Sequence, residues 1–377
     1  MQEVIVKILT RTNLEDYIAG AAILGCGGGG NVDHAMEMLN DALGKGHAFK
    51  LADLSELPDD EVISILGWVG GGVPKDVMER VAPYYEKLPE RKLQMISGLK
   101  KASAGLSEYL GKQLYSYLAT ETGPENGILP MYLAAIEGKV CVDADCCGRS
   151  KPELGLSLTN VAGIPIAPFC MVTPFDETLI VKNTVDDQRG EDISRYIAIA
   201  SGGRVCVARC PATVAVYRKA AAPNQVTRCI RIGEAVRMAL TQGKDPVVAL
   251  VKQANAKKLF QGTVTSLEIE GRGGFNWGNW NIVGTGEFRG HTFKVWFKNE
   301  NLLSWLDGEP SVVCPDLICI VDNKTGEGLS NFVPSGEHAG KEVAVLGVKA
   351  VPAWKTKRGL EIFNPRHFGY DIDYREW

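Results

Sequence analysis

Two carboxylates stand two positions apart, at Asp143 and Asp145, and Arg149 and Glu153 follow them in the same short stretch. A carboxylate can act as a general base toward water, and a guanidinium can hold a carboxylate through two parallel hydrogen bonds. The stretch therefore predicts a catalytic site in which Asp143, Asp145 and Glu153 are acid–base candidates and Arg149 binds the substrate. The alternative is a strand cap, in which Arg149 pairs with Asp143 or Asp145 for structural reasons.

A predicted strand positions these side chains. Residues 139–142 are short, apolar and rich in valine, a pattern typical of a buried strand. In open α/β sheets, ligands bind outside the carboxyl ends of the strands. The polar stretch begins where this strand ends, so the sequence predicts a ligand site at that edge of the sheet.

A second polar loop is predicted to reach the same edge. Residues 115–136 predict a strand, a polar loop and a helix, and the next strand should run parallel to the first after a right-handed crossover. If the two strands are neighbours, Glu121, Glu125 and Asn126 lie beside the acidic stretch, and Gly70–Gly72 line the same edge. Glu121 is then a further catalytic candidate, and Glu125 and Asn126 are substrate-binding candidates.

A glycine-rich loop at residues 25–30 lies between two predicted helices, over residues 14–22 and 32–43. Its spacing fits the dinucleotide pattern G-x-G-x-x-G, but that pattern requires a preceding strand, so a Rossmann cofactor site is not predicted. Backbone amides at a helix N-terminus can bind an anion or a polarised carbonyl. The alternative is a tight turn between helices. The substrate-binding candidates in this loop are Gly27, Gly28, Gly29 and Gly30.

Three cysteines lie inside these motifs, and two ligand candidates follow a later strand. Cys26, Cys146 and Cys147 are candidate nucleophiles, because a neighbouring arginine or a helix N-terminus lowers the pKa of a thiol. The alternative, which we favour, is that they are small buried residues. Asn299 and Glu300 follow a predicted strand at residues 293–297, where they either contact a ligand or complete the turn.

No cofactor follows from the sequence, but zinc is one option. Asp143 and Asp145 could ligate a divalent ion if a distant histidine joined them, and His338 and His367 are the candidates because both lie in polar loops. The five histidines include no pair at the i, i+4 spacing of a predefined zinc motif.

Composition excludes several classes of protein. The chain has 377 residues, 45% of them hydrophobic and 23% charged, and a net charge of −4, which argues against a nucleic-acid or membrane partner. No apolar run reaches the roughly 18 residues needed to cross a bilayer, and the first residues do not resemble a signal peptide. We therefore expect a cytoplasmic protein whose ten cysteines are thiols.

The chain is long enough for two domains. Residues 1–168 predict an α/β domain with a largely parallel sheet, which carries the glycine loop and the acidic stretch. Residues 169–377 predict a mostly β domain, barrel-like or sandwich-like, with short strands separated by glycine and asparagine turns. Helices within about residues 190–255 are expected to pack on the first domain.

Taken together, these motifs resemble the bacterial S-methyl-thiohydantoin desulfurase family, whose domains also occur fused to hydantoinase or oxoprolinase proteins. The resemblance spans nearly the whole chain and rests on residues 24–30, 121–127, 143–153, 297–301, 315–318 and 365–371. It implies an α/β domain followed by a mostly β domain. It also implies hydrolysis of an S-methylated thiohydantoin to a hydantoin and methanethiol, in the breakdown of ergothioneine-type compounds.

The sequence departs from the family pattern at its cysteines. Position 26 is commonly threonine in the family, and positions 146 and 147 are not normally cysteine, which argues against a cysteine nucleophile there. We expect a hydrolase of a small cyclic thiohydantoin-like or hydantoin-like molecule, able to form a homo-oligomer. The alternative is a non-catalytic ligand-binding or regulatory subunit that partners a hydantoinase-like or oxoprolinase-like enzyme.

Overall fold

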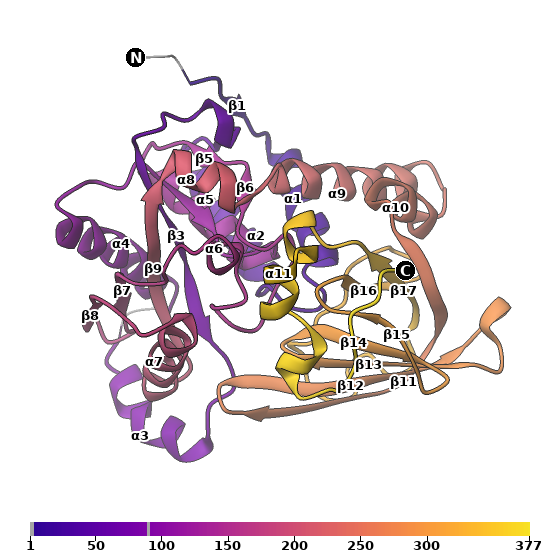
Figure 1. The fold of residues 1–377 in the computed structure, drawn as a ribbon. Helices are drawn as coiled ribbons and strands as arrows, with labels where there is room; N and C mark the ends of the chain where they lie inside the picture. Colours follow the sequence, from indigo (N-terminus) through magenta and orange to yellow (C-terminus); the bar gives the residue numbers. More distant parts are fainter. Residues whose placement is uncertain (1–3, 89–90) are drawn as a thin grey trace.

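The computed structural model describes residues 4–88 and 91–377. An α/β half, drawn from indigo to rose, packs beside an antiparallel sheet drawn in orange, and the yellow C-terminal segment runs along both halves (Figure 1). The predicted fold class is confirmed. Two details differ: the α/β sheet is mixed rather than largely parallel, and the second sheet is one curled half-barrel rather than a closed barrel or a sandwich.

The main sheet of the α/β half has the strand order β10-β6-β4-β3-β9-β7-β8. Only the neighbours β3–β4 and β4–β6 are parallel pairs. Strand β9 is antiparallel to β3 on one side and to β7 on the other, and β8 and β10 are also antiparallel to their neighbours. Its strands are β3 (Val62–Gly70), β4 (Ser116–Ala119), β6 (Ala144–Asp145), β7 (Phe169–Val172), β8 (Thr178–Val181), β9 (Arg204–Thr213) and β10 (Ala222–Pro223).

A smaller sheet and a set of helices complete this half. The small sheet joins β1 (Lys7–Ile8), β2 (Lys50–Ala52) and β5 (Cys141–Val142). Neighbouring residues on β3 and β4 point into separate buried clusters, as in a sheet that is covered on both faces. The helices are α1 (Arg11–Leu24), α2 (Val32–Gly44), α3 (Lys75–Tyr85), α4 (Arg91–Leu110), α5 (Pro124–Ile136), α6 (Leu158–Val161), α7 (Asp187–Ala200) and α8 (Val214–Ala220).

The second half is a seven-stranded antiparallel sheet with the order β15-β14-β13-β12-β11-β17-β16. Two helices, α9 (Gln225–Thr241) and α10 (Pro246–Ala254), precede it. Its strands are β11 (Lys257–Arg272), β12 (Phe275–Gly284), β13 (Thr292–Lys298), β14 (Glu300–Leu306), β15 (Glu309–Val313), β16 (Leu317–Asp322) and β17 (Glu342–Val348), and α11 (Lys357–Ile362) follows them.

Helix α9 packs closely on α1, as expected for a helix between residues 190 and 255. The crossing depends on glycine, because a Cβ on Gly20 would lie 2.0 Å from the carbonyl oxygen of Cys229, and one on Gly233 would lie 2.0 Å from that of Asp16. Strands β7–β10 belong to the same sheet as β3, β4 and β6. A domain boundary at residue 168 therefore assigns strands of one sheet to two domains.

Candidate functional site

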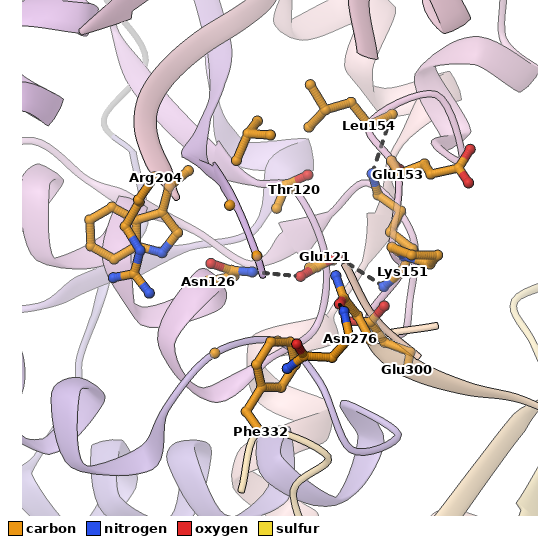
Figure 2. Close-up of a pocket in the computed structure, with 18 of the residues that line it drawn as sticks. Thr120, Glu121, Asn126, Lys151, Glu153, Leu154, Arg204, Asn276, Glu300 and Phe332 are labelled. Carbon is orange, nitrogen blue, oxygen red and sulfur yellow. Dashed lines mark hydrogen bonds between the residues drawn. The ribbon is translucent and has the colours of Figure 1, made fainter. Parts of the chain in front are cut away.

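A cleft of about 380 Å³ opens at the carboxyl ends of β3 and β4, where the glycine loop meets the first residues of β12 and β14 (Figure 2). Gly70, Gly71 and Gly72 form part of its wall, so the loops that follow β3 and β4 meet at this edge of the sheet, but Asp143, Asp145 and Arg149 do not line the cleft. The sequence-predicted residues that line it are Gly29, Gly30, Glu121, Glu125, Asn126, Glu153, Asn299 and Glu300.

Glu121 follows strand β4 and is almost fully buried. Its Oε1 accepts a hydrogen bond of 2.6 Å from Asn126 Nδ2, and its Oε2 accepts one of 2.9 Å from the backbone amide of Lys151. Burial raises the pKa of Glu121, although the Lys151 ammonium and both hydrogen bonds oppose that rise. Each oxygen has an N–H donor, an arrangement that favours the ionised carboxylate.

Glu300 reaches the cleft from the first position of β14 and is 3% exposed. Its Oε2 has no hydrogen-bond partner in the described part of the chain. Burial, and then the negative charge of Glu121, raise the pKa of Glu300 well above its usual value. Two carboxyls that sense each other's charge do not both ionise easily. Glu300, whose pKa is raised well above its usual value, is therefore the member of the pair that more readily holds a proton.

The turn before Glu300 is fixed by Asn299, whose φ of 59° lies in the left-handed region that asparagine tolerates. The Asn299 side chain accepts a hydrogen bond of 2.8 Å from the amide of Asn276, and its own amide donates to the Asn276 carbonyl. Asn299 therefore completes the turn, which was one of the two alternatives, and it also lines the cleft.

Glu125 ties the glycine loop to helix α5. Its carboxylate contacts the amide of Asn31 at 2.8 Å, His34 at 3.3 Å and Arg204 at 3.2 Å. Burial would raise the pKa of Glu125, but His34 and Arg204 outweigh burial and hold it below the usual value. The carbonyl of Gly29 accepts hydrogen bonds from the amides of Glu125 and Asn126, so the loop and the helix are held together.

Gly27 and Gly28 do not line this cleft but a smaller pocket that shares Gly30 and Phe332 with it. A Cβ on Gly28 would sit 2.0 Å from Glu300 Oε1, and one on Gly27 would sit 2.5 Å from Asn331 Nδ2. Glycine at position 28 is therefore required for Glu300 to take its place. The helix-to-helix setting predicted for this loop is confirmed by α1 before it and α2 after it.

Asp143 and Asp145 do not line the cleft, and their oxygens are occupied by neighbouring donors. Asp143 accepts from the amide and the hydroxyl of Thr227, in the first turn of α9. Asp145 accepts from the amides of Cys147 and Gly148 at 2.8 and 2.6 Å, and from the Thr122 hydroxyl. Both aspartates hold backbone segments together, and the structure does not place them as bases beside a substrate.

Arg149 requires a correction of both sequence-based explanations. Its side chain is fully buried, and its guanidinium donates to the carbonyls of Ser150, Asn301, Pro315 and Asp316 at 2.6–3.3 Å. It neither pairs with Asp143 or Asp145 nor faces the cleft. The guanidinium is instead enclosed by segments of the C-terminal half that lie far away in sequence, and it fixes the acidic stretch against that half.

The end of the acidic stretch does reach the cleft, through Lys151 and Glu153. Lys151 Nζ donates to the carbonyls of Glu153 at 3.0 Å and Leu154 at 3.3 Å, and burial lowers its pKa. Glu153 pairs with Lys298 and, at 2.8 Å, with His367. Burial would raise the pKa of Glu153, but these two partners lower it to about 2, so Glu153 is a permanent carboxylate.

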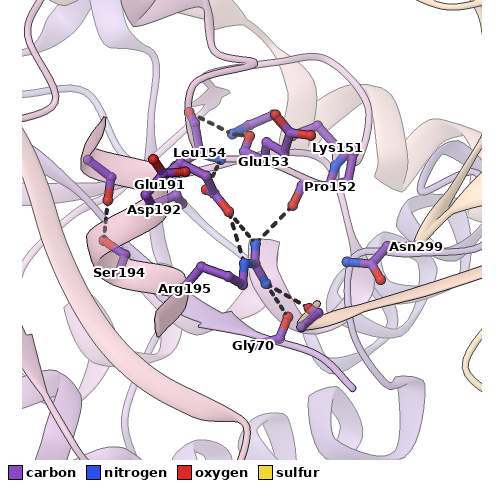
Figure 3. A network of polar contacts seen from close by, with 12 residues as sticks. Gly70, Lys151, Pro152, Glu153, Leu154, Glu191, Asp192, Ser194, Arg195 and Asn299 are labelled. Carbon is purple, nitrogen blue, oxygen red and sulfur yellow. Dashed lines mark hydrogen bonds and ion pairs between the residues drawn. The ribbon is translucent and has the colours of Figure 1, made fainter. Parts of the chain in front are cut away.

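Arg195 joins the walls of the cleft, and Figure 3 shows its network. Its guanidinium pairs with Glu191 at 2.8 Å and donates to the carbonyls of Pro152, Gly70 and Gly274 at 2.6–3.1 Å. It also stacks over the ring of Phe275 at 4.1 Å. One side chain of α7 therefore connects the acidic stretch, the end of β3 and the β11–β12 hairpin.

The cleft-lining residues that the sequence did not single out include Trp68, Lys151, Arg195, Arg204, Asn276 and Phe332. The sequence contained a local signal for two of these residues, Trp68 and Lys151. Trp68 lies near the end of the predicted strand that leads into the glycines at 70–72, and Lys151 lies inside the acidic stretch itself. Nothing local indicates Arg195, Asn276 or Phe332, because their positions depend on packing between distant segments.

The cysteines and histidines have separate surroundings. Burial raises the pKa values of Cys146 and Cys147. Burial would raise the pKa of the fully buried Cys26, but the hydrogen bond with Cys319 and the charge of Arg149 outweigh burial and lower this pKa to about 7. His338 stacks on Trp280, and His367 pairs with Glu153. In the described residues no three histidine, cysteine or acidic side chains could together hold a metal ion.

The fold and the cleft define a two-part protein in which a pair of unequal carboxyls lies between an α/β half and a curled β sheet. The chain belongs to the S-Me-THD-like family: the model of the N-terminal domain matches residues 12–183, and that of the C-terminal domain matches residues 185–377. The suspected family is thereby confirmed.

A crystal structure of a protein from Chromobacterium violaceum has the same fold, with a TM-score of 0.77 and 21% identity, covering 98% of this chain and 99% of that one. No protein with a curated description matches the chain. Across residues 4–88 and 91–377, no helix is both long and apolar enough to cross a membrane.

Proposed function

We propose that this chain is a hydrolase that converts a small S-methylated thiohydantoin-type ring into the corresponding hydantoin and methanethiol. Membership of the S-Me-THD-like family supports the substrate class. The observation that carries the proposal is the unequal carboxyl pair in the cleft, with two N–H donors on Glu121 and an unpartnered oxygen on Glu300. Environments that push two carboxyl pKa values apart are typical of acid–base pairs.

Glu121 is the base in this mechanism. It takes a proton from a water molecule while the water oxygen bonds to the ring carbon that carries sulfur. Glu300, which is neutral, gives its proton to the ring nitrogen as the carbon–nitrogen double bond opens. Positioned acids and bases of this kind typically contribute about 10²–10⁴-fold in rate.

The second step breaks the carbon–sulfur bond. The hydroxyl oxygen of the adduct becomes the new carbonyl and returns its proton to Glu300, while protonated Glu121 gives its proton to the departing sulfur. The sum is one ring and one water in, and one hydantoin and one methanethiol out. Both carboxyls end in their starting states, so the cycle needs no further reactant.

The remaining wall residues would hold the ring. The carbonyls of Gly27 and Gly29 accept hydrogen bonds that fix the glycine loop. Gly29 and Gly30 line the cleft, and in this proposal their backbone amides donate to a carbonyl of the ligand. Lys151 and Arg195 are already bound to backbone carbonyls, so they act by fixing the wall and not by binding the ring directly.

The test is release of free thiol from an S-methyl-thiohydantoin by the isolated chain. Glu300→Gln should reduce kcat by about 10²-fold or more, because glutamine cannot give up a proton. Asp16→Asn is the matched control: Asp16 is also a buried carboxyl, but it pairs with Arg237 on α9, away from the cleft. That variant should keep wild-type kcat per folded molecule.

Two outcomes would count against the proposal. Full activity in folded Glu300→Gln would remove the acid–base pair from the mechanism. Binding of thiohydantoins and hydantoins without any turnover by the wild-type chain is what the alternative role predicts, that of a ligand-binding subunit partnering a hydantoinase-like enzyme.

A further inference from the structure

Three residues that line the cleft each have a buried polar side-chain atom without a hydrogen-bond partner in the described part of the chain. These atoms are Trp68 Nε1, Asn126 Oδ1 and Glu300 Oε2. A buried polar group without a partner is costly, so such groups are rare and need an explanation. Their concentration in one cleft indicates a ligand that supplies the missing partners.

The hydrogen-bonding role of two of these atoms is fixed by chemistry. An indole Nε1–H can only donate, so Trp68 requires an acceptor from the ligand. Asn126 donates through Nδ2 to Glu121 at 2.6 Å, which makes its other amide atom, Oδ1, the acceptor. Asn126 therefore requires a donor from the ligand.

Both side chains stand at the same end of adjacent parallel strands. Trp68 is on β3 close to its end, and Asn126 is in the first turn of α5, just after β4, the neighbour of β3. The Arg204 guanidinium covers the Trp68 ring at 4.7 Å. The indole is thus held in place while its N–H has no acceptor among residues 4–88 and 91–377.

The charges of the cleft disfavour an anionic ligand. Glu121, Glu125 and Glu153 all line it. The three cations at its wall already have partners: Lys151 and Arg195 donate to backbone carbonyls, and Arg204 pairs with Glu125. An added carboxylate or phosphate would meet three carboxylates without a cation dedicated to it.

We infer that the cleft selects an uncharged ring carrying an N–H beside a carbonyl, with the carbonyl accepting from Trp68 Nε1 and the N–H donating to Asn126 Oδ1. This inference rests on the proposed function, and it names the groups of the ring that the protein recognises. Trp68 and Asn126 are then specificity-determining residues, whereas Glu121 and Glu300 carry out the reaction. The cyclic amide edge of a hydantoin has this donor–acceptor pair.

Binding experiments test the inference without turnover. Ethylene urea and ethylene carbonate are five-membered rings of nearly the same shape, and both have one carbonyl. Ethylene urea has two N–H groups where ethylene carbonate has two ring oxygens. Wild-type protein should bind ethylene urea at least about fivefold more tightly, the effect of one hydrogen bond to a buried acceptor. In Asn126→Ala this ratio should fall toward one, and the comparison within one variant cancels any effect on Glu121.

Trp68→Phe keeps the aromatic body and removes only the N–H. It should weaken hydantoin binding by about fivefold or more while leaving the melting temperature near that of the wild type. Equal binding of urea and carbonate by wild type, or unchanged hydantoin affinity in folded Trp68→Phe, would overturn the inference. Failure of thiol release with this binding pattern intact would overturn the proposed function alone.

Discussion

The chain contains two pairs of buried acids near one sheet edge, Asp143 with Asp145 and Glu121 with Glu300, and the two pairs differ in how their oxygens are filled. Burial raises the pKa of all four. Every oxygen of the aspartates accepts from an amide or a hydroxyl, whereas Glu300 has one oxygen without a partner among the described residues. Glu121 and Glu300 also line the cleft, and Asp143 and Asp145 do not. The comparison indicates that access to the cleft, more than burial or spacing, separates acids that could react from acids that hold the fold.

The largest expected effect is on turnover and compares one member of each pair. Glu121→Gln should lower kcat/KM by about 10²–10⁴-fold, because the amide cannot accept the water proton. Asp145→Asn should keep kcat/KM per folded molecule within about threefold, since the asparagine oxygen still accepts from the amides of Cys147 and Gly148. Steady-state kinetics on both variants give the ratio. A loss in Asp145→Asn as large as that in Glu121→Gln would reverse the comparison.

The next effect is on stability and concerns Arg149. Arg149→Met should lower the free energy of unfolding by about 3 kcal/mol or more, because several buried carbonyls lose a charged donor. Urea denaturation measures this change. Arg204→Met, at the cleft wall and partly exposed, is the control and should cost less. Unchanged stability in Arg149→Met together with a raised KM would restore the substrate-binding role predicted from the sequence.

The smallest effect is a pH dependence that belongs to Glu300. Because its pKa is raised in the folded state, its contribution to stability is fully present below the ordinary glutamate pKa, near 4.5, and is lost as the pH rises through the folded value. The unfolding free energy of wild type, relative to that of Glu300→Gln, should therefore fall as the pH increases above about 4.5. A parallel pair of stability-against-pH curves would show that Glu300 is not held neutral.

The fold and much of the cleft could be predicted because they follow from local patterns. Strand β4, the loop with Glu121 and helix α5 have the alternation and glycine-proline signals of a strand-helix-strand unit, and parallel strands bring their following loops to one edge. This reasoning placed Glu125 and Asn126 at the same edge as Gly70–Gly72, and the cleft contains all of them.

What could not be predicted depends on contacts between distant segments. Thr227 fills the oxygens of Asp143 from 84 residues away, and the carbonyls around Arg149 come from residues more than 150 positions later. A motif shows that acids and an arginine are close in sequence, but not which donors the fold brings to them. The catalytic assignment of Asp143 and Asp145 could therefore not be made from the sequence alone.

The two buried arginines, Arg149 and Arg195, have a consequence for how the molecule comes apart. Each guanidinium sits on an α/β segment and holds carbonyls of the β half, at Asn301, Pro315 and Asp316 for one and at Gly274 for the other. Separating the halves would break the hydrogen bonds of both guanidiniums to the β half at once, so neither half should melt before the other. Calorimetry is expected to record a single cooperative transition, with equal calorimetric and van't Hoff enthalpies.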